Sequence, residues 1–287
     1  MSDVGLRANL VGVAVNVALA IAKLTVGVVA GSQALLADGF NSAGDVVATA
    51  VAAGAYRFAM EPADENHPYG HGNAESVAGL MIGVVLFATG VYIALSGSIA
   101  LAAGSIEAPG ALALPVAAAT IVTKELLYRY TIRVGTQLNS PSLKAAARDH
   151  RADVLSATAV LGGVAGARMG LPWLDPVAAV VIGLYIAGMA LEPVRENLGV
   201  LMDESDPEQA ERIRLLAREV EEVREVSRVR VHPMGSYLVV DLEIFVDGSA
   251  SLFAAHELAH EVEEHVKERE PHVVDVSVHV NPTGLKP

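Results

Sequence analysis

Long apolar segments alternate with short polar ones up to about residue 200 of the chain. Each apolar segment is close to the roughly 20 residues that a helix needs to cross the hydrocarbon core of a lipid bilayer. The pattern therefore predicts six membrane-spanning helices, at about 9–31, 34–58, 76–103, 111–134, 143–168 and 174–198.

The pattern changes at residue 203, after which the segments are shorter and more charged. Apolar residues recur at helical spacing in PEQAERIRLLAREVEEV and in SLFAAHELAHEVEEHVKERE, where Ser251 can cap the helix. Apolar and polar residues alternate in SRVRVHP, YLVVDLEIFVD and HVVDVSVHV, with Gly235 in the first turn. We therefore expect an all-α membrane domain of six helices over residues 1–202. A small cytoplasmic α+β domain of order αββαβ should follow over residues 203–287, with both helices on one face of the sheet.

Composition agrees with a membrane protein and limits its partners. The chain is 52% hydrophobic and 18% charged, which is too apolar for an ordinary soluble protein. From Asp203 onward lie 19 of the 33 acidic and nine of the 20 basic residues, about −10 of the net charge of −13. An acidic domain attracts cations and argues against a nucleic acid as partner. Because the chain has no cysteine, disulfides, thiolate metal sites and cysteine nucleophiles are excluded.

The distribution of Lys and Arg predicts the orientation in the membrane. Basic residues gather at alternate ends of the predicted spans, near Arg7, Arg57, 124–133, 144–151 and Arg195. By the positive-inside rule, both termini and the loop at residues 60–75 face the cytoplasm. The start, MSDVGLRANL, lacks the features of a cleaved signal peptide, so we expect the first span to be retained.

Two pairs of polar residues interrupt the second and fifth spans: Asn41 with Asp45, and Asp149 with Asp153. The run from Val154 to Gly170 has only 17 residues, so the fifth helix must begin earlier and carry its two aspartates into the bilayer. Only 11 residues separate Asp45 from Arg57, which places Asp45 at membrane depth as well. The alternative interpretation puts these charges at helix ends on the membrane surface, but it leaves two helices too short.

Residues four apart share one face of a helix, so two facing helices would bring these four side chains together. Three carboxylates and one amide carbonyl make an all-oxygen ligand set for a divalent cation. Without a cation, carboxylates crowded in a low dielectric take up protons, so such a site can exchange metal for protons. In the alternative, the carboxylates pair with Lys23, Lys124 or Arg151 and only hold helices together. Asp38 could extend the site or line its entry path, but we expect it to lie outside the ligand set and to cap or bond a neighbouring helix.

Two further groups of residues could bind metal on the cytoplasmic side. Asp64, His67 and His71 lie in the loop PADENHPYGHGNAE and are suitable ligand types, although two histidines in a loop often serve only hydrogen bonding. Later in the chain, His256 and His260 share a helix face, and Asp241 and His279 lie on strands that could be directed at the same helix.

Together these segments resemble the cation diffusion facilitator family. The similarity is specific in ADGFNSAGD, HPYGHGNAES and DHRAD, and it continues through VVDLEIFVD, SLFAAHELAHEVE and VVDVSVHVNP. It implies a homodimeric transporter, not an enzyme, in the cell (plasma) membrane, which exports a divalent metal in exchange for H+ by alternating access. The family's transport site matches Asn41, Asp45, Asp149 and Asp153. Its loop site matches Asp64, His67 and His71, and its cytoplasmic-domain sites match Asp241, His256 and His279.

The transport-site residues predict which metal is carried. Members of the family that handle zinc commonly have a histidine where Asp149 stands, and the all-oxygen set here resembles the manganese-type pattern. Oxygen ligands also suit Mn²⁺ and imidazole suits Zn²⁺. On a helix, His150 should point about 100° away from Asp149, which makes it a poor ligand. We therefore predict Mn²⁺, with Zn²⁺ or a broader set with Fe²⁺, Co²⁺ and Cd²⁺ as the alternative. A membrane-anchored metal sensor and a passive cation channel are the rival functions.

Overall fold

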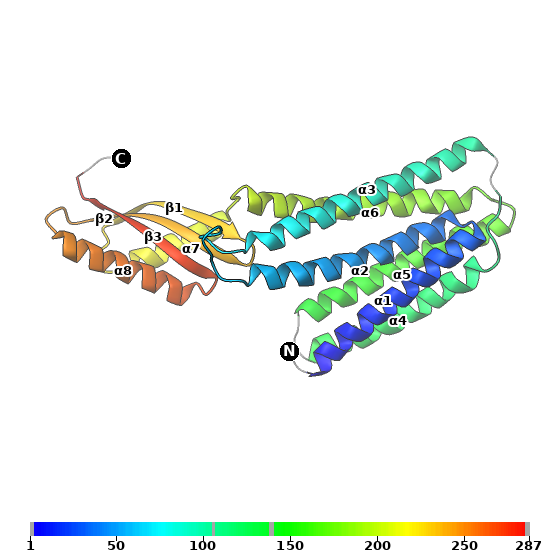
Figure 1. The fold of residues 1–287 in the computed structure, drawn as a ribbon, viewed down its shortest axis with the longest axis horizontal. Helices are drawn as coiled ribbons and strands as arrows, with labels where there is room; N and C mark the ends of the chain where they lie inside the picture. The colour runs from blue at the N-terminus through cyan, green and yellow to red at the C-terminus, as the bar shows by residue number, and fades with distance from the viewer. Residues whose placement is uncertain (1–2, 105–106, 138–140, 285–287) are drawn as a thin grey trace. The chain divides into compact units, whose positions relative to one another are not determined.

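The computed structural model describes residues 3–104, 107–137 and 141–284. Six long helices come first (Figure 1): α1 (Asp3–Ala30), α2 (Gln33–Ala59), α3 (Asn73–Ala103), α4 (Ala113–Gln137), α5 (Pro141–Arg168) and α6 (Leu174–Leu201). As the length of the apolar run required, α5 begins two turns before Asp149, and α2 continues past Asp45 to Ala59. Residues 105 and 106, in the predicted loop between the third and fourth spans, lie outside the described residues.

Three of these helices are long and apolar enough to cross a membrane: α1 at Leu10–Ala30, α3 at Asn73–Ala103 and α6 at Leu174–Leu201. No other helix in the described ranges meets that standard, so the structure supports three of the six predicted spans. The other three, α2, α4 and α5, contain the charged residues of the predicted transport site and its surroundings, which lowers their mean hydropathy.

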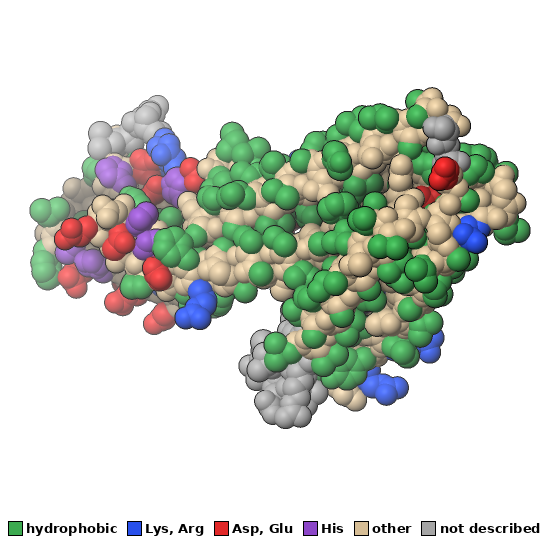
Figure 2. Space-filling model, turned by 45° about the vertical axis from the view of Figure 1, so that its right-hand side comes forward, with side chains coloured by type: hydrophobic (Ala, Val, Ile, Leu, Met, Phe, Trp, Pro, Cys, Tyr) green, Lys and Arg blue, Asp and Glu red, His purple; other side chains and the backbone are tan. Residues whose placement is uncertain are grey.

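Apolar side chains are exposed across the helical part of the molecule, whereas acidic and histidine side chains gather on the α/β part (Figure 2). On α3, for example, Tyr92 and Ile99 are 67% and 68% exposed. A soluble monomer rarely exposes apolar surface on this scale, and lipid is the environment that such a surface fits.

The chain forms two compact units, Met1–Val51 with Ile82–Glu192 and Ala52–Met81 with Pro193–Pro287. In the first unit, α4 packs against both α1 and α5 (Figure 1). Its core contains Leu35 of α2, Val160 of α5 and Ile182 of α6. The backbones of α3 and α6 approach closely, because a Cβ atom at Gly90 would lie 2.6 Å from the carbonyl oxygen of Gly183.

The α/β part of the second unit follows the predicted order, with α7 (Pro207–Arg218), β1 (Glu225–Met234), β2 (Tyr237–Val246), α8 (Leu252–Arg269) and β3 (Val273–Pro282). Strand β2 is central, antiparallel to β1 and parallel to β3, and α8 makes the crossover that a parallel pair needs. Gly235 turns between β1 and β2 with φ 62°, and the Ser251 hydroxyl caps α8 by accepting from the N–H of Ala254.

One hydrophobic core joins both helices to the sheet. Ile213 of α7 and Val262 of α8 share this core with alternate residues of β2, including Val240 and Ile244. The two helices also contact each other. Both therefore cover the same face of the sheet, as predicted.

The second unit also contains the loop between α2 and α3, which packs against the turn between β1 and β2. The Tyr237 hydroxyl accepts from the N–H of Gly72 at 3.0 Å and donates to the carbonyl of Tyr69 at 2.9 Å. A Cβ atom at Gly72 would lie 2.3 Å from the carbonyl oxygen of Met234, so only glycine fits there. These contacts fix the backbone on which the loop histidines stand.

Candidate metal sites

A cavity of about 560 Å³ lies in the first unit and is lined from α1, α2, α4, α5 and α6. All four residues predicted for the transport site line it: Asn41, Asp45, Asp149 and Asp153. They come from the two helices that the sequence predicted to face each other, and each helix supplies two residues four apart.

Direct contact joins the two halves of this set. The Asn41 Nδ2 atom donates to the Asp153 Oδ1 atom at 3.4 Å, which links α2 to α5. Asp153 is only 6% exposed, Asp45 is half-buried and Asp149 is exposed. The set therefore runs from a buried carboxylate at Asp153 to an accessible one at Asp149. Whether the four residues bind metal is not tested by this geometry and stays a prediction.

Two buried lysines bear on the alternative that these carboxylates only hold helices together. Lys124 of α4 pairs with Asp153 and also donates to the Asn16 Oδ1 atom at 2.8 Å. In contrast, the carboxylates of Asp45 and Asp149 have neither an ion pair nor a hydrogen bond within the described residues. Helix pairing thus accounts for Asp153 alone, and two carboxylates remain available to a cation.

Lys23 makes a separate buried pair with Asp38. Its Nζ atom lies 2.6 Å from the Asp38 Oδ2 atom and 3.0 Å from the Ser42 hydroxyl. The Ser156 hydroxyl donates to the other Asp38 oxygen at 2.9 Å. Asp38 does not line the cavity, and it links α2 to both α1 and α5. This confirms the expectation that it bonds neighbouring helices, and its exclusion from the ligand set stays a prediction.

His150 lies closer to the predicted transport site than expected. Helical spacing predicts that it points away from Asp149, yet both residues line the same cavity. The cavity extends beyond Asp149 as far as Gly12 of α1, which lies against the His150 ring. The imidazole is buried and its Nδ1 atom has no hydrogen-bond partner among the described residues. Helical spacing alone could not show how wide the cavity is.

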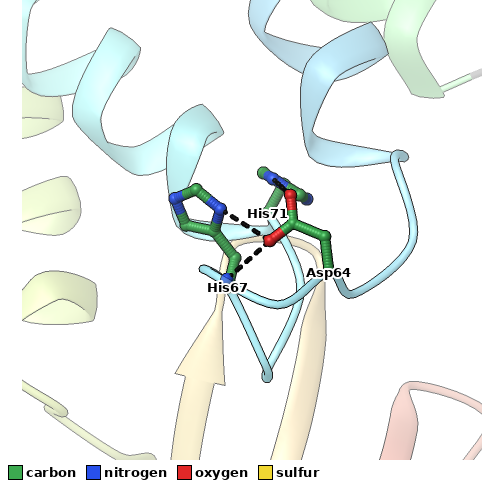
Figure 3. A group of neighbouring side chains, drawn as sticks. All are labelled: Asp64, His67 and His71. Carbon is green, nitrogen blue, oxygen red and sulfur yellow. Dashed lines mark hydrogen bonds and ion pairs between the residues drawn. The ribbon is translucent and has the colours of Figure 1, made fainter.

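The second predicted site lies in the loop between α2 and α3 (Figure 3), where Asp64, His67 and His71 offer ligand atoms within 4.8 Å of one another. The Asp64 carboxylate contacts both rings, with one oxygen 3.1 Å from His67 Nδ1 and the other 3.5 Å from His71 Nε2. No other group of three such side chains is this close within the described ranges.

Contacts around this loop affect the charge of Asp64 and the position of the His71 ring. Hydrogen bonds from the backbone N–H groups of His67 and Asn66 hold the pKa of Asp64 below its usual value, so the carboxylate is charged at neutral pH. The buried His71 ring packs edge-on against Phe58, and its Nδ1 atom lies 3.3 Å from the carbonyl oxygen of Glu61. Donation from Nδ1 to that carbonyl would leave Nε2 free for a metal, an arrangement common around metal-binding histidines. The same contacts also fit a loop held only by hydrogen bonds.

The structure does not bring together the three residues predicted for the cytoplasmic domain, Asp241, His256 and His279. The Asp241 Oδ2 atom lies 3.4 Å from His232 Nε2. The His256 ring lies against the His260 ring, with 3.2 Å between their Nε2 atoms. Metal binding by the predicted set is untested and stays a prediction. His260 was not among the predicted ligands, although the spacing in HELAH places it one turn after His256.

Comparison with known proteins agrees with this fold. Residues 10–202 match the family described as "Cation efflux transmembrane domain", and residues 205–283 match "Cation efflux protein, cytoplasmic domain". The chain belongs to the cation efflux, or cation diffusion facilitator, family, and it is a multi-pass membrane transporter and not an enzyme. This confirms the resemblance drawn from the sequence motifs.

Individual relatives cover nearly the whole chain. The manganese efflux system protein MneP of Bacillus subtilis (strain 168) is 31% identical over 284 residues, which is 96% of this chain and 95% of that protein. Metal tolerance protein C1 of Arabidopsis thaliana is 35% identical over 291 residues, 96% of this chain and 62% of that protein. Among solved structures, a nickel form of the "MamM CTD" is 26% identical, covering 25% of this chain and 91% of that chain with a TM-score of 0.25.

Proposed function

We propose that this transporter exports Mn²⁺ from the cytoplasm in exchange for protons by alternating access. Asn41, Asp45, Asp149 and Asp153 hold the ion in this proposal. The observation that carries it is that all four residues line one cavity although they come from two separate helices. The relative MneP, named as a manganese efflux protein, supports the same cargo.

The ligand set favours Mn²⁺ on chemical grounds. Its donors are carboxylate and amide oxygens, which suit a hard divalent ion. The carboxylates of Asp45 and Asp149 have no protein partner in the described chain, so a cation does not have to break an ion pair to reach them. The amide of Asn41 presents its nitrogen to Asp153, and a rotation of that side chain would present its oxygen to the metal.

Competition between metal and protons would drive the exchange. In the cytoplasm-facing state, Mn²⁺ displaces protons from the carboxylates and neutralises them. In the outward-facing state, protons from the other side return to the same oxygens and release the metal. Helices α2 and α5 carry all four ligands, so a movement of this pair relative to its neighbours could change the side from which the site is open.

We propose the following topology for this mechanism. Residues 1–202 form a membrane domain in which α2, α4 and α5 also span the bilayer, giving six spans, and residues 203–287 form a cytoplasmic domain that dimerises. Both termini then face the cytoplasm of a cell membrane, consistent with the positive-inside rule. The match of residues 205–283 to the family called ZT_dimer supports the homodimer.

Equilibrium dialysis of the purified full-length protein tests the Mn²⁺ site. Asp45→Asn should abolish Mn²⁺ binding at the transport site, because it removes one of the two unpaired carboxylates. The matched control is Asp38→Asn, which changes a buried aspartate on the same helix and should keep Mn²⁺ binding. Equal Mn²⁺ binding by Asp45→Asn and the wild-type protein would refute the assignment.

We also propose that Asp64, His67 and His71 bind a second ion, Zn²⁺ in preference to Mn²⁺, because two imidazoles suit zinc. The same dialysis, run with Zn²⁺, tests this proposal. His71→Ala should lose one bound Zn²⁺ per chain and keep Mn²⁺ at the transport site. Unchanged Zn²⁺ binding would leave the loop with a hydrogen-bonding role only.

One observation favours Zn²⁺ as a second candidate cargo. The buried imidazole of His150 lines the transport cavity, and its Nδ1 atom lacks a hydrogen-bond partner in the described chain. An imidazole at this position could supply the nitrogen ligand that the four predicted residues lack.

A further inference from the structure

Lys124 lies inside the helical unit, and its ammonium group contacts the predicted transport site. The residue is fully buried, and its ammonium group contacts the Asp153 Oδ2 atom and the Asn16 Oδ1 atom, the latter at 2.8 Å. A buried ammonium requires such partners, because it has lost its hydration. Its two partners differ, since Asp153 is a carboxylate residue of the predicted ligand set, whereas Asn16 is an amide residue of α1.

Both oxygens of Asp153 are engaged by groups of the protein itself. Lys124 contacts Oδ2, and the Asn41 amide donates to Oδ1. A divalent ion that coordinates Asp153 must therefore share its oxygens with these donors or displace one of them, and it also repels the ammonium group at short range. Metal binding and the pairing of Lys124 with Asp153 oppose each other.

We infer that Lys124 is a tethered counter-cation of the transport site, which competes with the metal for Asp153. It pairs with Asp153 when no metal is bound, and shifts toward Asn16 when a divalent ion enters. With Lys124 included, the three carboxylates carry a net charge of −2, which one divalent ion neutralises. This inference rests on the proposed function, because it requires Asp153 to be a metal ligand.

A competitor of this kind affects binding and release in opposite directions. Without Lys124, the site would hold Mn²⁺ more tightly but would lose the charge that helps to expel the ion. The result expected for Lys124→Gln is a lower Kd and a lower KM together with a lower kcat. A lysine that only holds helices together predicts a different result, because its loss would weaken binding or leave the Kd unchanged.

The chain offers a matched control in Lys23. This residue is also fully buried and also pairs with an aspartate, Asp38. Neither lysine lines the transport cavity, and the two pairs differ in their carboxylates, since Asp153 lines the cavity and Asp38 does not. Lys23→Gln thus removes an equally buried charge from the same unit and should lower the Tm as Lys124→Gln does, without altering Mn²⁺ binding.

The experiment measures the Kd for Mn²⁺ by calorimetry and the kinetics of flux, using the full-length protein. Lys124→Gln should bind Mn²⁺ about tenfold more tightly than the wild-type protein, and Lys124→Arg and Lys23→Gln should bind as the wild-type protein does. Asn16→Ala keeps both charges and removes only the alternative partner of Lys124, so it should weaken Mn²⁺ binding severalfold even if Lys124→Gln does not fold.

Unchanged or weaker Mn²⁺ binding by Lys124→Gln would overturn this inference but not the proposed function. If Lys124→Gln does not fold, an unchanged Kd for Mn²⁺ in Asn16→Ala would overturn it in the same way. If the wild-type protein binds no Mn²⁺, the proposed function fails, and the inference fails with it.

Discussion

Asp153→Ala is expected to reduce Mn²⁺ flux into proteoliposomes by at least about 100-fold, because loss of even an outer-shell partner of a metal site costs on the order of 10- to 100-fold. Asp153 is the carboxylate at which α2, α4 and α5 meet, through its contacts with Asn41 and Lys124. Its removal would take away a ligand and also leave the Lys124 charge buried without a carboxylate.

The effect of the unpaired Lys124 charge must be distinguished from the effect of the lost ligand. Breaking a buried ion pair by removing one partner costs about 3–5 kcal/mol of stability, so a misfolded variant could also fail to transport. Asp38→Ala breaks the equally buried pair with Lys23 outside the cavity and provides the comparison. At equal amounts of reconstituted protein, Asp38→Ala should retain most of its Mn²⁺ flux. Undiminished flux in Asp153→Ala would remove Asp153 from the site.

Asp149→His is expected to raise the ratio of Zn²⁺ flux to Mn²⁺ flux by about tenfold or more, because imidazole is a better ligand for zinc than for manganese. Asp149 is exposed and has no ion pair in the described chain, so the substitution should cost little stability. The measurement is flux of each metal through the same reconstituted preparation, with separate fluorescent indicators for Zn²⁺ and Mn²⁺.

His150→Ala is the control for this change. It removes the natural imidazole that lines the cavity and, on the proposed ligand set, should leave Mn²⁺ flux unchanged. If the natural protein already transports mainly Zn²⁺ and His150→Ala abolishes that flux, the zinc alternative is correct and the manganese assignment is wrong.

Much of the site could be predicted because spacing and length are properties of the sequence. The four-residue interval in Asn41–Asp45 and in Asp149–Asp153 fixes a shared helix face. The 17-residue apolar run after Asp153 was too short to span, and α5 does begin well before it, at Pro141. The alternation in YLVVDLEIFVD likewise predicted a strand, and β2 forms there.

Other features depend on how helices rotate against each other, which spacing does not determine. The sequence offered Lys23, Lys124 and Arg151 as equal partners for the carboxylates. Only the packing of α4 against α5 selects Lys124 for Asp153, and Arg151 pairs instead with Glu125. The cavity that joins His150 to the predicted site is a property of the packed helices in the same way.

Contacts between segments that are far apart in the chain also could not be predicted from the sequence. Tyr237 bonds the loop between α2 and α3 across more than 160 positions of the chain. No local sequence pattern identifies Tyr237 as the residue that holds this loop. Gly72 does indicate a close backbone approach, because any side chain there would clash with the turn.

The most direct test of the central claim is Mn²⁺ flux into proteoliposomes with and without a pH gradient. Proton exchange at Asp45 and Asp149, the two carboxylates without a protein partner in the described chain, predicts that protons leave the vesicles as Mn²⁺ enters. It also predicts that an outward proton gradient accelerates Mn²⁺ entry, and that Asp45→Asn abolishes both movements. Mn²⁺ flux that is the same at every pH gradient, with no accompanying proton movement, would contradict antiport and indicate a passive channel.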